Sequence, residues 1–271
     1  MNEPPRSAPL ELMSGRARAV VEPAGSRVRS LVVDGRDLLV APGDDPLLWG
    51  CYPMAPWAGR LDRGRFGHDG EPIEVPVDLP PHAIHGLGVH QVWDRSGDGF
   101  DLDLRGLWPL GGRVASRFEL TEQALTMQVE VTAGDRSMPV VLGWHPCFRR
   151  HLDHNRPVAV GFAPERWWVR GVDGLPTGET TPPPPGPWDD CFDGVASAPT
   201  LTWPGRLTVT LEADTETWVV FDERDHTVCV EPQTAPPDAF NKGGATILAP
   251  GERTGLRFTI AWGAPASGGP A

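Results

Sequence analysis

The segment Leu125-Thr-Met-Gln-Val-Glu-Val131 decides the fold class, because apolar and polar residues alternate along it one by one. This period of two places the apolar side chains on one face of a β-strand. The helical period of 3.6 residues is scarce in the chain. The alternation recurs at Phe100, Leu102 and Leu104, at Leu207, Val209 and Leu211, and at Leu256, Phe258 and Ile260. We therefore predict an all-β fold of half-buried antiparallel strands.

Short turn sequences separate these strands. Asp34-Gly35, Asp69-Gly70 and Gly97-Asp98-Gly99 have the residue types that tight hairpin connections favour. The chain contains 32 glycines and 31 prolines, and most prolines fall between apolar runs, which fits many tight connections better than disorder. The pattern predicts a sandwich or a barrel of many short strands.

The chain has no internal repeat and no linker long enough to divide it. Its 271 residues are enough for one large all-β domain with a substantial core. We therefore predict a single domain over residues 1–271. Residues 1–15 and 262–271 are expected to form loose tails at its ends.

Composition disfavours several classes of function. The net charge of −12 and the isoelectric point near 5.1 oppose binding to a phosphate backbone, so no nucleic-acid partner is expected. No apolar run approaches the roughly 20 residues that cross a bilayer, so no membrane partner is expected either. The N-terminus lacks the layout of a signal peptide, which makes the cytoplasm the default location.

The cysteines and the single lysine narrow the chemistry further. The four cysteines are far apart in sequence and form no CxxC pair, which argues against a disulfide framework and a thiolate zinc site. We expect reduced, mostly buried thiols. Lys242, the only lysine, lies in a glycine-rich turn, so Schiff-base chemistry is not expected.

Two segments each place one acid/base side chain inside an apolar, strand-like run. His145 lies within Gly143-Trp-His-Pro-Cys-Phe148, and Glu231 follows Val228-Cys-Val230. Surroundings of low polarity can move the pKa of an imidazole or a carboxyl toward neutrality, as proton transfer at pH 7 requires. A buried histidine can also be purely structural, but a buried carboxylate costs too much free energy to be incidental. These segments predict an enzyme.

Three further residues, Arg60, His85 and Asp189, lie beside aromatic residues and prolines. Together with His145 and Glu231 they supply the donors and acceptors that suit a polyhydroxylated ligand. Structural roles are the alternative, because Arg60 could form an ion pair with Asp62 or another carboxylate, and Asp189 could cap a turn. His82, His85, His145 and Cys147 could also suggest a metal, but no strand spacing fixes them as a tetrahedral set.

These segments resemble, in the same chain order, those of the aldose 1-epimerase (mutarotase) family. The resemblance covers most of residues 30–260. Its first part is Gly59-Arg60 followed by Gly64-Arg65-Phe66 and then His85-Gly86. Its later parts are His145-Pro146-X-Phe148, Asp189-X-X-Phe192, and Glu231-Pro-Gln-Thr234 with Pro237-Asp-Ala-X-Asn241.

The resemblance implies a large antiparallel β-sandwich of the galactose mutarotase-like type that opens and recloses the ring of a small-molecule aldose. It implies that Glu231 takes the proton of the anomeric hydroxyl while His145 protonates the ring oxygen. Arg60, His85 and Asp189 would hold sugar hydroxyls, and neither a cofactor nor a metal would be needed. Trp57, Trp144 and Trp188 flank the motifs and are candidates for stacking on the sugar.

The sequence departs from the family pattern at three places. Gly59 replaces a common asparagine, Cys147 replaces a tyrosine, and Val89 lies where many relatives carry an arginine, which weakens the case for a phosphorylated sugar. The alternatives are a non-catalytic sugar-binding protein on the same fold, a hexose-6-phosphate 1-epimerase, and a glycoside hydrolase that would use Asp189 with Glu231. The natural sugar and the oligomeric state stay open.

Overall fold

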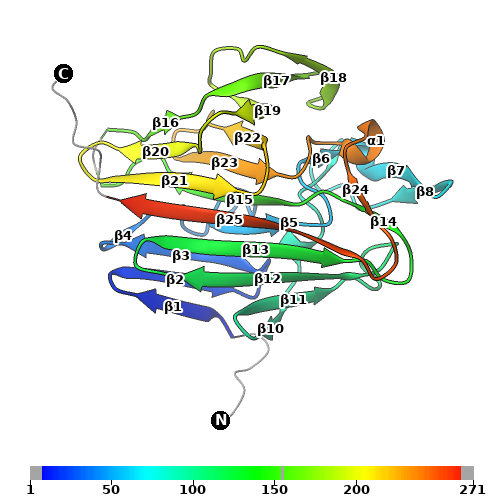
Figure 1. Cartoon of the computed structure of the whole chain (residues 1–271), viewed down its shortest axis with the longest axis horizontal. Coiled ribbons are helices and arrows are strands. Elements are labelled where there is room, and N and C mark those ends of the chain that lie inside the picture. The colour runs from blue at the N-terminus through cyan, green and yellow to red at the C-terminus, as the bar shows by residue number, and fades with distance from the viewer. Residues whose placement is uncertain (1–7, 154–155, 264–271) are drawn as a thin grey trace, which may run out of the picture.

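The computed structural model describes residues 8–153 and 156–263, and two large antiparallel sheets dominate it (Figure 1). Helical structure in these residues is limited to α1 (Ala239–Lys242) and the short 3-10 helices η1 (Asp62–Gly64) and η2 (Gly88–His90). The predicted all-β class is therefore confirmed. No helix in the described ranges has the length and apolar character needed to cross a bilayer.

The larger sheet has 11 strands and carries the segments singled out from the sequence. Its spatial order is β1 (Leu10–Ser14), β2 (Ala17–Glu22), β3 (Arg27–Val33), β5 (Cys51–Met54), β15 (Gly143–Arg149), β23 (Thr227–Gln233), β22 (Thr217–Phe221), β19 (Asp189–Val195), β17 (Pro164–Arg170) and β18 (Pro176–Thr181), with β4 (Arg36–Asp37) paired to β3.

The second sheet has eight strands. Its spatial order is β10 (Asp94–Ser96), β11 (Gly99–Asp103), β12 (Arg113–Leu120), β13 (Ala124–Thr132), β25 (Arg253–Gly263), β21 (Leu207–Ala213), β20 (Thr200–Trp203) and β16 (Ala159–Gly161). Three small pairs complete the described strands: β6 (Arg60–Leu61) with β9 (Ala83–Ile84), β7 (Arg65–His68) with β8 (Glu71–Glu74), and β14 (Met138–Val140) with β24 (Thr246–Leu248).

The two large sheets pack against each other as a sandwich, and their facing side chains form one apolar core. Trp144 of β15 meets Phe118 of β12, and Trp218 of β22 meets Phe258 of β25, at ring-centroid distances of 6.1 and 6.4 Å. Each large apolar side chain that is fully buried contributes about 1.5–3 kcal/mol relative to an exposed one. Of the two architectures that the strand pattern allowed, the structure adopts the sandwich.

The alternating segments become the strands that they predict. Leu125, Met127 and Val129 of β13 lie opposite Ile260, Phe258 and Leu256 of β25, and all six side chains are buried. The polar residues between them point away from the core. Every second residue of β13 is therefore buried, as the alternation in its sequence predicts.

Two of the predicted turns have the backbone that their residues suggest. Asp34 and Gly35 connect β3 to β4 with φ values of 49° and 78°, and Asp69 and Gly70 connect β7 to β8 with φ values of 50° and 78°. A positive φ at both central residues is the requirement of a two-residue hairpin turn, which Asp-Gly meets with little strain.

The expected tails are wrong in part. Leu10–Ser14 forms β1 at the edge of the sheet and pairs with Ala17–Val21 of β2. The side chain of Leu10 is buried there, which helps to hold the strand in place. At the other end, Trp262 and Gly263 still belong to β25, and the Trp262 indole donates to the carbonyl of Glu122. Residues 1–7 and 264–271 lie outside the described part of the chain.

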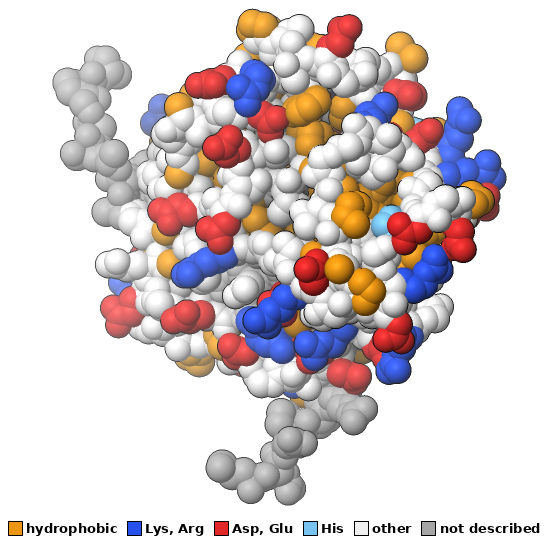
Figure 2. Space-filling view, turned by 45° about the vertical axis from the view of Figure 1, so that its right-hand side comes forward, with side chains coloured by type: hydrophobic (Ala, Val, Ile, Leu, Met, Phe, Trp, Pro, Cys, Tyr) orange, Lys and Arg blue, Asp and Glu red, His pale blue; other side chains and the backbone are white. Residues whose placement is uncertain are grey.

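The surface and the thiols agree with the composition. Acidic and basic side chains alternate over the face shown in Figure 2, without a broad basic patch on that face. All four cysteines are free and buried, as expected from their spacing.

Candidate active site

The site is built on one face of two neighbouring strands, β15 and β23. Their antiparallel register pairs Gly143 with Gln233 and Cys147 with Cys229. His145 lies midway between Gly143 and Cys147, and Glu231 lies midway between Gln233 and Cys229, so the two residues are opposite each other on the neighbouring strands. Alternate residues of a strand share a face, so both side chains lie on the same face of the sheet as these paired residues. Their sequence neighbours Trp144 and Val230 point to the opposite face, into the core of the sandwich.

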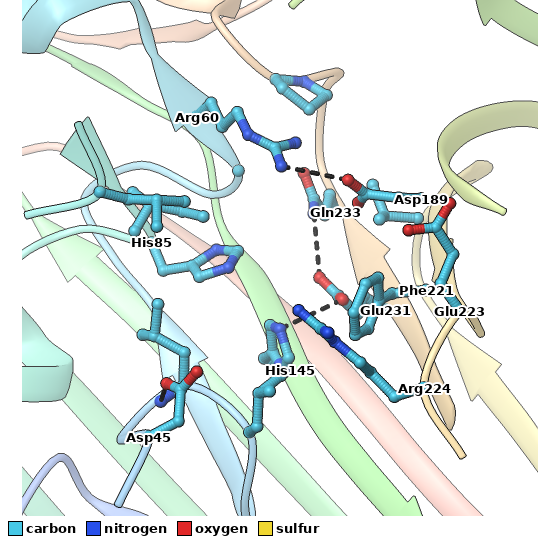
Figure 3. Close-up of a pocket in the computed structure, with 17 residues that line it drawn as sticks. Asp45, Arg60, His85, His145, Asp189, Phe221, Glu223, Arg224, Glu231 and Gln233 are labelled. Atoms are coloured by element: carbon cyan, nitrogen blue, oxygen red, sulfur yellow. Dashed lines mark hydrogen bonds and ion pairs between the residues drawn. The ribbon is translucent and has the colours of Figure 1, made fainter. Parts of the chain in front are cut away.

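His145 and Glu231 contact each other directly (Figure 3). The Nε2 atom of His145 lies 3.3 Å from Oε1 of Glu231, and their side chains are only 6% and 3% exposed. Gln233 Nε2 donates a hydrogen bond of 3.4 Å to the other carboxylate oxygen, and His145 Nδ1 lies 3.4 Å from the Cys147 sulfur. The imidazole and the carboxyl group are thus oriented by neighbours on the same two strands.

Burial shifts the two groups in opposite directions. Loss of solvent, and secondarily the positive charge of Arg27, lowers the pKa of His145 to about 3. Loss of solvent, with the charge of Asp189 as a further cause, raises the pKa of Glu231 well above its usual value. Both shifts favour the neutral forms, a neutral imidazole on His145 and a protonated carboxyl group on Glu231.

His85 faces the same pair from the connection that follows β9. Its ring meets the His145 ring edge-on, with centroids 4.8 Å apart, and burial lowers the pKa of His85 well below its usual value. The residue has a φ of 57°, and it precedes Gly86, where a Cβ atom would overlap the Ala55 carbonyl. Its buried Nδ1 atom has no hydrogen-bond partner among the described residues.

Arg60 and Asp189 pair with each other on the far side of the pocket. Arg60 Nη2 lies 3.1 Å from Asp189 Oδ2, and Arg170 Nη1 lies 2.7 Å from the same oxygen. Arg60 therefore does form an ion pair, as the structural alternative expected, but with Asp189 and not with Asp62. Two arginines hold Asp189 in a fixed position, where its remaining oxygen can accept a hydrogen bond.

The local backbone explains one departure from the family pattern. Gly59 has a φ of 68°, and a Cβ atom there would lie 2.8 Å from Cγ of Pro237. A side chain such as asparagine has no room at this position unless Pro237 moves. Asp238 secures the same segment, because its carboxylate accepts the backbone N–H of Asp62 and the side-chain amide of Asn241.

A cavity of about 280 Å³ is lined by all five residues named from the sequence: Arg60, His85, His145, Asp189 and Glu231. Its volume is at the lower end of the roughly 300–1,000 Å³ of small-molecule sites, which suits one monosaccharide. The structure thus brings the five side chains together from β6, the β9–η2 connection, β15, β19 and β23 (Figure 3).

Several other residues line the cavity that were not singled out from the sequence. Gln233 is the one that spacing could have found, because it is two residues beyond Glu231 and so shares its face of β23. Further lining residues come from connections or from β22 and had no such signal: Asp45, Leu47, Leu48, Leu79, Val219, Phe221, Glu223 and Arg224.

The tryptophans proposed for sugar stacking do not line the cavity. Trp57 and Trp144 are buried in the core, and Trp188 packs against it. The aromatic residue at the cavity wall is Phe221, on the strand next to β23.

Two groups of buried side chains in the described residues are close enough to hold a metal ion. One is His85, His145 and Glu231, and the other is His145, Cys147 and Cys229. His82 is in neither group, and its ring nitrogens instead bind the Arg63 N–H and the Asp173 carbonyl. The contact between His145 and Glu231 already pairs a proton donor with an acceptor, so we assign no metal, and its absence stays a prediction.

Comparison with known proteins gives a family match over most of the chain. A family model described as aldose 1-epimerase matches residues 10–261. No curated protein sequence matches the chain.

Solved structures share the fold at low sequence identity. A galactose mutarotase-like protein of Clostridium acetobutylicum is 18% identical with a TM-score of 0.83, over 94% of each chain. A provisionally named aldose 1-epimerase of Escherichia coli K12 is 22% identical with a TM-score of 0.82, over 95% of this chain and 99% of the other. A galactose 1-epimerase of Lactobacillus acidophilus is 15% identical with a TM-score of 0.78, over 95% of each chain.

Proposed function

The chain belongs to the aldose 1-epimerase family, and we propose that it interconverts the α and β anomers of a free aldose by opening and reclosing the sugar ring. The observation that carries this proposal is the contact of 3.3 Å between His145 and Glu231 at the wall of one cavity. The anomeric hydroxyl and the ring oxygen of a sugar are bound to the same carbon. A base that takes the proton of the hydroxyl and an acid that protonates the ring oxygen must therefore lie close together, as Glu231 and His145 do.

In the proposed reaction, the Glu231 carboxylate takes the proton of the anomeric hydroxyl while the His145 imidazolium donates a proton to the ring oxygen. The bond between the anomeric carbon and the ring oxygen breaks, and an open-chain aldehyde forms. After rotation about the adjacent carbon–carbon bond, the hydroxyl attacks the other face of the aldehyde and both protons return. Each proton transfer contributes about 10²–10⁴-fold in rate.

The neutral forms that burial favours for His145 and Glu231 are compatible with this cycle. Neutral His145 with protonated Glu231 holds the same number of protons as imidazolium with carboxylate. The two arrangements differ only in the position of one proton along the Nε2–Oε1 contact. The pair can therefore reach the active form without exchanging a proton with water, and the neutral form is the one that the open-chain intermediate requires.

The remaining side chains suit orientation of the sugar. Arg60 and His85 supply donors, Asp189 supplies an acceptor, and the unpaired Oε1 of buried Gln233 supplies another. Holding the reacting groups in place is worth several kcal/mol in such reactions.

The contacts at the site weigh against two of the alternatives. A silent sugar-binding protein would not need an acid and a base in contact. A glycoside hydrolase would need a second carboxyl group that donates or attacks, but Asp189 Oδ2 accepts from both Arg60 and Arg170.

A hexose 6-phosphate is a second candidate substrate, because Arg224 at the cavity wall forms no ion pair with any carboxylate in residues 8–153 and 156–263. Val89 does not argue against it, since this side chain is buried beside Tyr52 and Met54 and does not line the cavity. Asp45 and Glu223 at the same wall oppose an anion. We therefore expect less than a tenfold preference for the phosphate, measured as kcat/KM for a hexose and its 6-phosphate.

Polarimetry of freshly dissolved single anomers of several aldoses tests the proposal. We expect rotation to reach its equilibrium value faster with the protein than in buffer. Release of sugar from glycosides would indicate a hydrolase instead. Binding by calorimetry without faster rotation would indicate a silent binding protein.

A further inference from the structure

Arg27 of β3 is a buried cation close to the site that the proposed reaction does not use. The residue is only 2% exposed, and no carboxylate of the described residues lies within ion-pair distance of it. Its Nη1 atom donates to the carbonyls of Pro46 and Trp49, at 2.7 and 3.1 Å, and its Nε atom has no hydrogen-bond partner within the described part of the chain. Burial of an unpaired charge is costly, which calls for a compensating role.

The guanidinium group is part of a series of stacked groups that ends at His145. Its carbon atom Cζ lies 3.9 Å from the ring centroid of Trp49 and 4.5 Å from that of Tyr52. The Tyr52 ring in turn stacks on the His145 ring, with centroids 4.8 Å apart and planes at 9°. The orientation of the His145 ring therefore depends on a tyrosine that Arg27 contacts directly.

Arg27 also holds a wall of the cavity. Pro46 and Trp49, whose carbonyls it binds, belong to the connection that contributes Asp45, Leu47 and Leu48 to the cavity lining. The Tyr52 hydroxyl donates to the carbonyl of Leu47 in the same connection. Arg27 therefore contacts both this wall of the cavity and Tyr52, the residue that stacks on the His145 ring.

We propose that Arg27 is a positioning residue for the proposed reaction: through Tyr52 it fixes the His145 ring and places a positive charge behind it. This inference rests on the proposed function for its effect on turnover. Its effect on His145 can be measured without turnover.

The electrostatic consequence follows from the groups around His145. Glu231 and Cys229 face it from β23, Tyr52 from β5, His85 from the β9–η2 connection, and Cys147 lies on its own strand. Glu231 is the carboxyl group in direct contact, and Arg27 is the cation behind Tyr52. Asp189, Arg60 and Arg224 line the same cavity and face the pair from β19, β6 and the connection after β22. A positive charge opposes added protons, so Arg27 makes the pair of His145 and Glu231 easier to deprotonate.

The size of the effect can be bounded. The stacking distances of 4.5 and 4.8 Å place the charge no more than about two ring layers from His145. At that separation and an effective dielectric constant of about 20, one charge shifts a pKa by about one unit.

The test compares kcat/KM against pH for the wild type, Arg27→Gln and Arg27→Lys. The rate falls on the alkaline side when the pair loses its shared proton. In Arg27→Gln we expect the alkaline limb of the pH profile, where kcat/KM falls, to shift to a pH about one unit higher, because a cation that favours proton loss is removed. In Arg27→Lys the charge is kept, so the alkaline limb should stay at its wild-type pH. An unchanged limb in Arg27→Gln, or an equal shift in both variants, would overturn the proposal.

Two further measurements keep the outcome decisive. NMR of labelled histidine should show the His145 ring gaining its proton at a higher pH in Arg27→Gln, even if no sugar is turned over. If that variant does not fold, Trp49→Leu exposes one face of the guanidinium to water and should give a smaller shift in the same direction. Arg117→Gln is the control for loss of a partly buried arginine in the other sheet. Arg117 binds the carbonyls of Phe100 and Ser116 and also pairs with Asp98 and Asp101, and its loss should leave the limb unchanged.

Discussion

The central strands of the two sheets differ in how they are buried. In β13 of the eight-stranded sheet, buried residues alternate with half-buried or exposed ones, whereas every residue of β23 in the larger sheet is buried. Both strands turn one face to the core of the sandwich. The other face of β23 is covered as well, and that face carries Glu231 and Gln233. Burial alternates along β13, which contributes only to the core, whereas β23, which carries site residues, is buried on both faces.

The difference has an energetic side. Buried polar groups cost free energy unless they are well paired, and an apolar strand could have filled the same place. His145, Glu231 and Gln233 instead lie in contact on this covered face. Local departures from the rules that build a core are expected where function requires them.

The largest effect is expected from Glu231→Gln. Removal of the proposed base should reduce the rate of anomer interconversion by about 10²–10⁴-fold, because one proton transfer is lost. The side chain keeps its shape, so circular dichroism should be unchanged. A variant with wild-type turnover would show that Glu231 does not carry the proton.

The same variant should not weaken the fold. The pKa of Glu231 is raised in the folded state, so its burial costs stability once the pH exceeds the pKa of the unfolded chain. The neutral amide removes that cost. The free energy of unfolding at pH 7 should therefore stay the same or increase in Glu231→Gln, which urea denaturation measures.

Met127→Ala tests the other side of the comparison. Met127 is fully buried on β13 and touches the sulfur of Cys51 between the sheets. We expect the free energy of unfolding to fall by about 2–5 kcal/mol, because a cavity replaces the side chain. Turnover of the remaining folded protein, measured well below the unfolding temperature, should stay at the wild-type level. A loss of turnover comparable to that of Glu231→Gln would contradict the separation of the two roles.

A smaller effect is expected from Arg170→Met. Arg170 contacts Asp189 at 2.7 Å and, more loosely, Asp190 at 3.4 Å, but it does not line the cavity that holds His145 and Glu231. Loss of this charged hydrogen bond should raise KM by about tenfold through a less ordered Asp189, with a smaller change in kcat. Arg166→Met on the same strand is the matched control, since Arg166 pairs only loosely with Glu165 at the surface. A fall in kcat with unchanged KM would assign Arg170 to the chemical step.

The sequence predicts the strands well because their signal is local. Leu125–Val131 alternates, and the turns at Asp34-Gly35 and Asp69-Gly70 are short and specific. The strand order could not be derived from the pattern, since β15 lies between β5 and β23 through contacts that are distant in sequence. The strand at Leu10–Ser14 was missed because its stability comes from pairing with β2 at the edge of the sheet.

The sequence predicts which residues form the site but not which of them contact one another. The five residues stood out as ionisable or polar groups beside aromatic residues and prolines, and the family resemblance gave their roles. Asp189 pairs with Arg60 and with a second arginine, Arg170, which lie 129 and 19 residues from it in the chain, and no sequence spacing encodes these contacts. Arg27 likewise gave no signal, because only the fold places it behind Tyr52.

The double variant Glu231→Gln with His145→Asn tests most directly the central claim that the two side chains act as one unit on one sugar. The measurement is the rate of anomer exchange, by proton NMR of the anomeric signals, for the wild type, both single variants and the double variant. Residues that act as a unit are strongly non-additive. We predict that the double variant is no slower than the slower single variant. Losses that multiply would show that His145 and Glu231 act independently and would contradict the account.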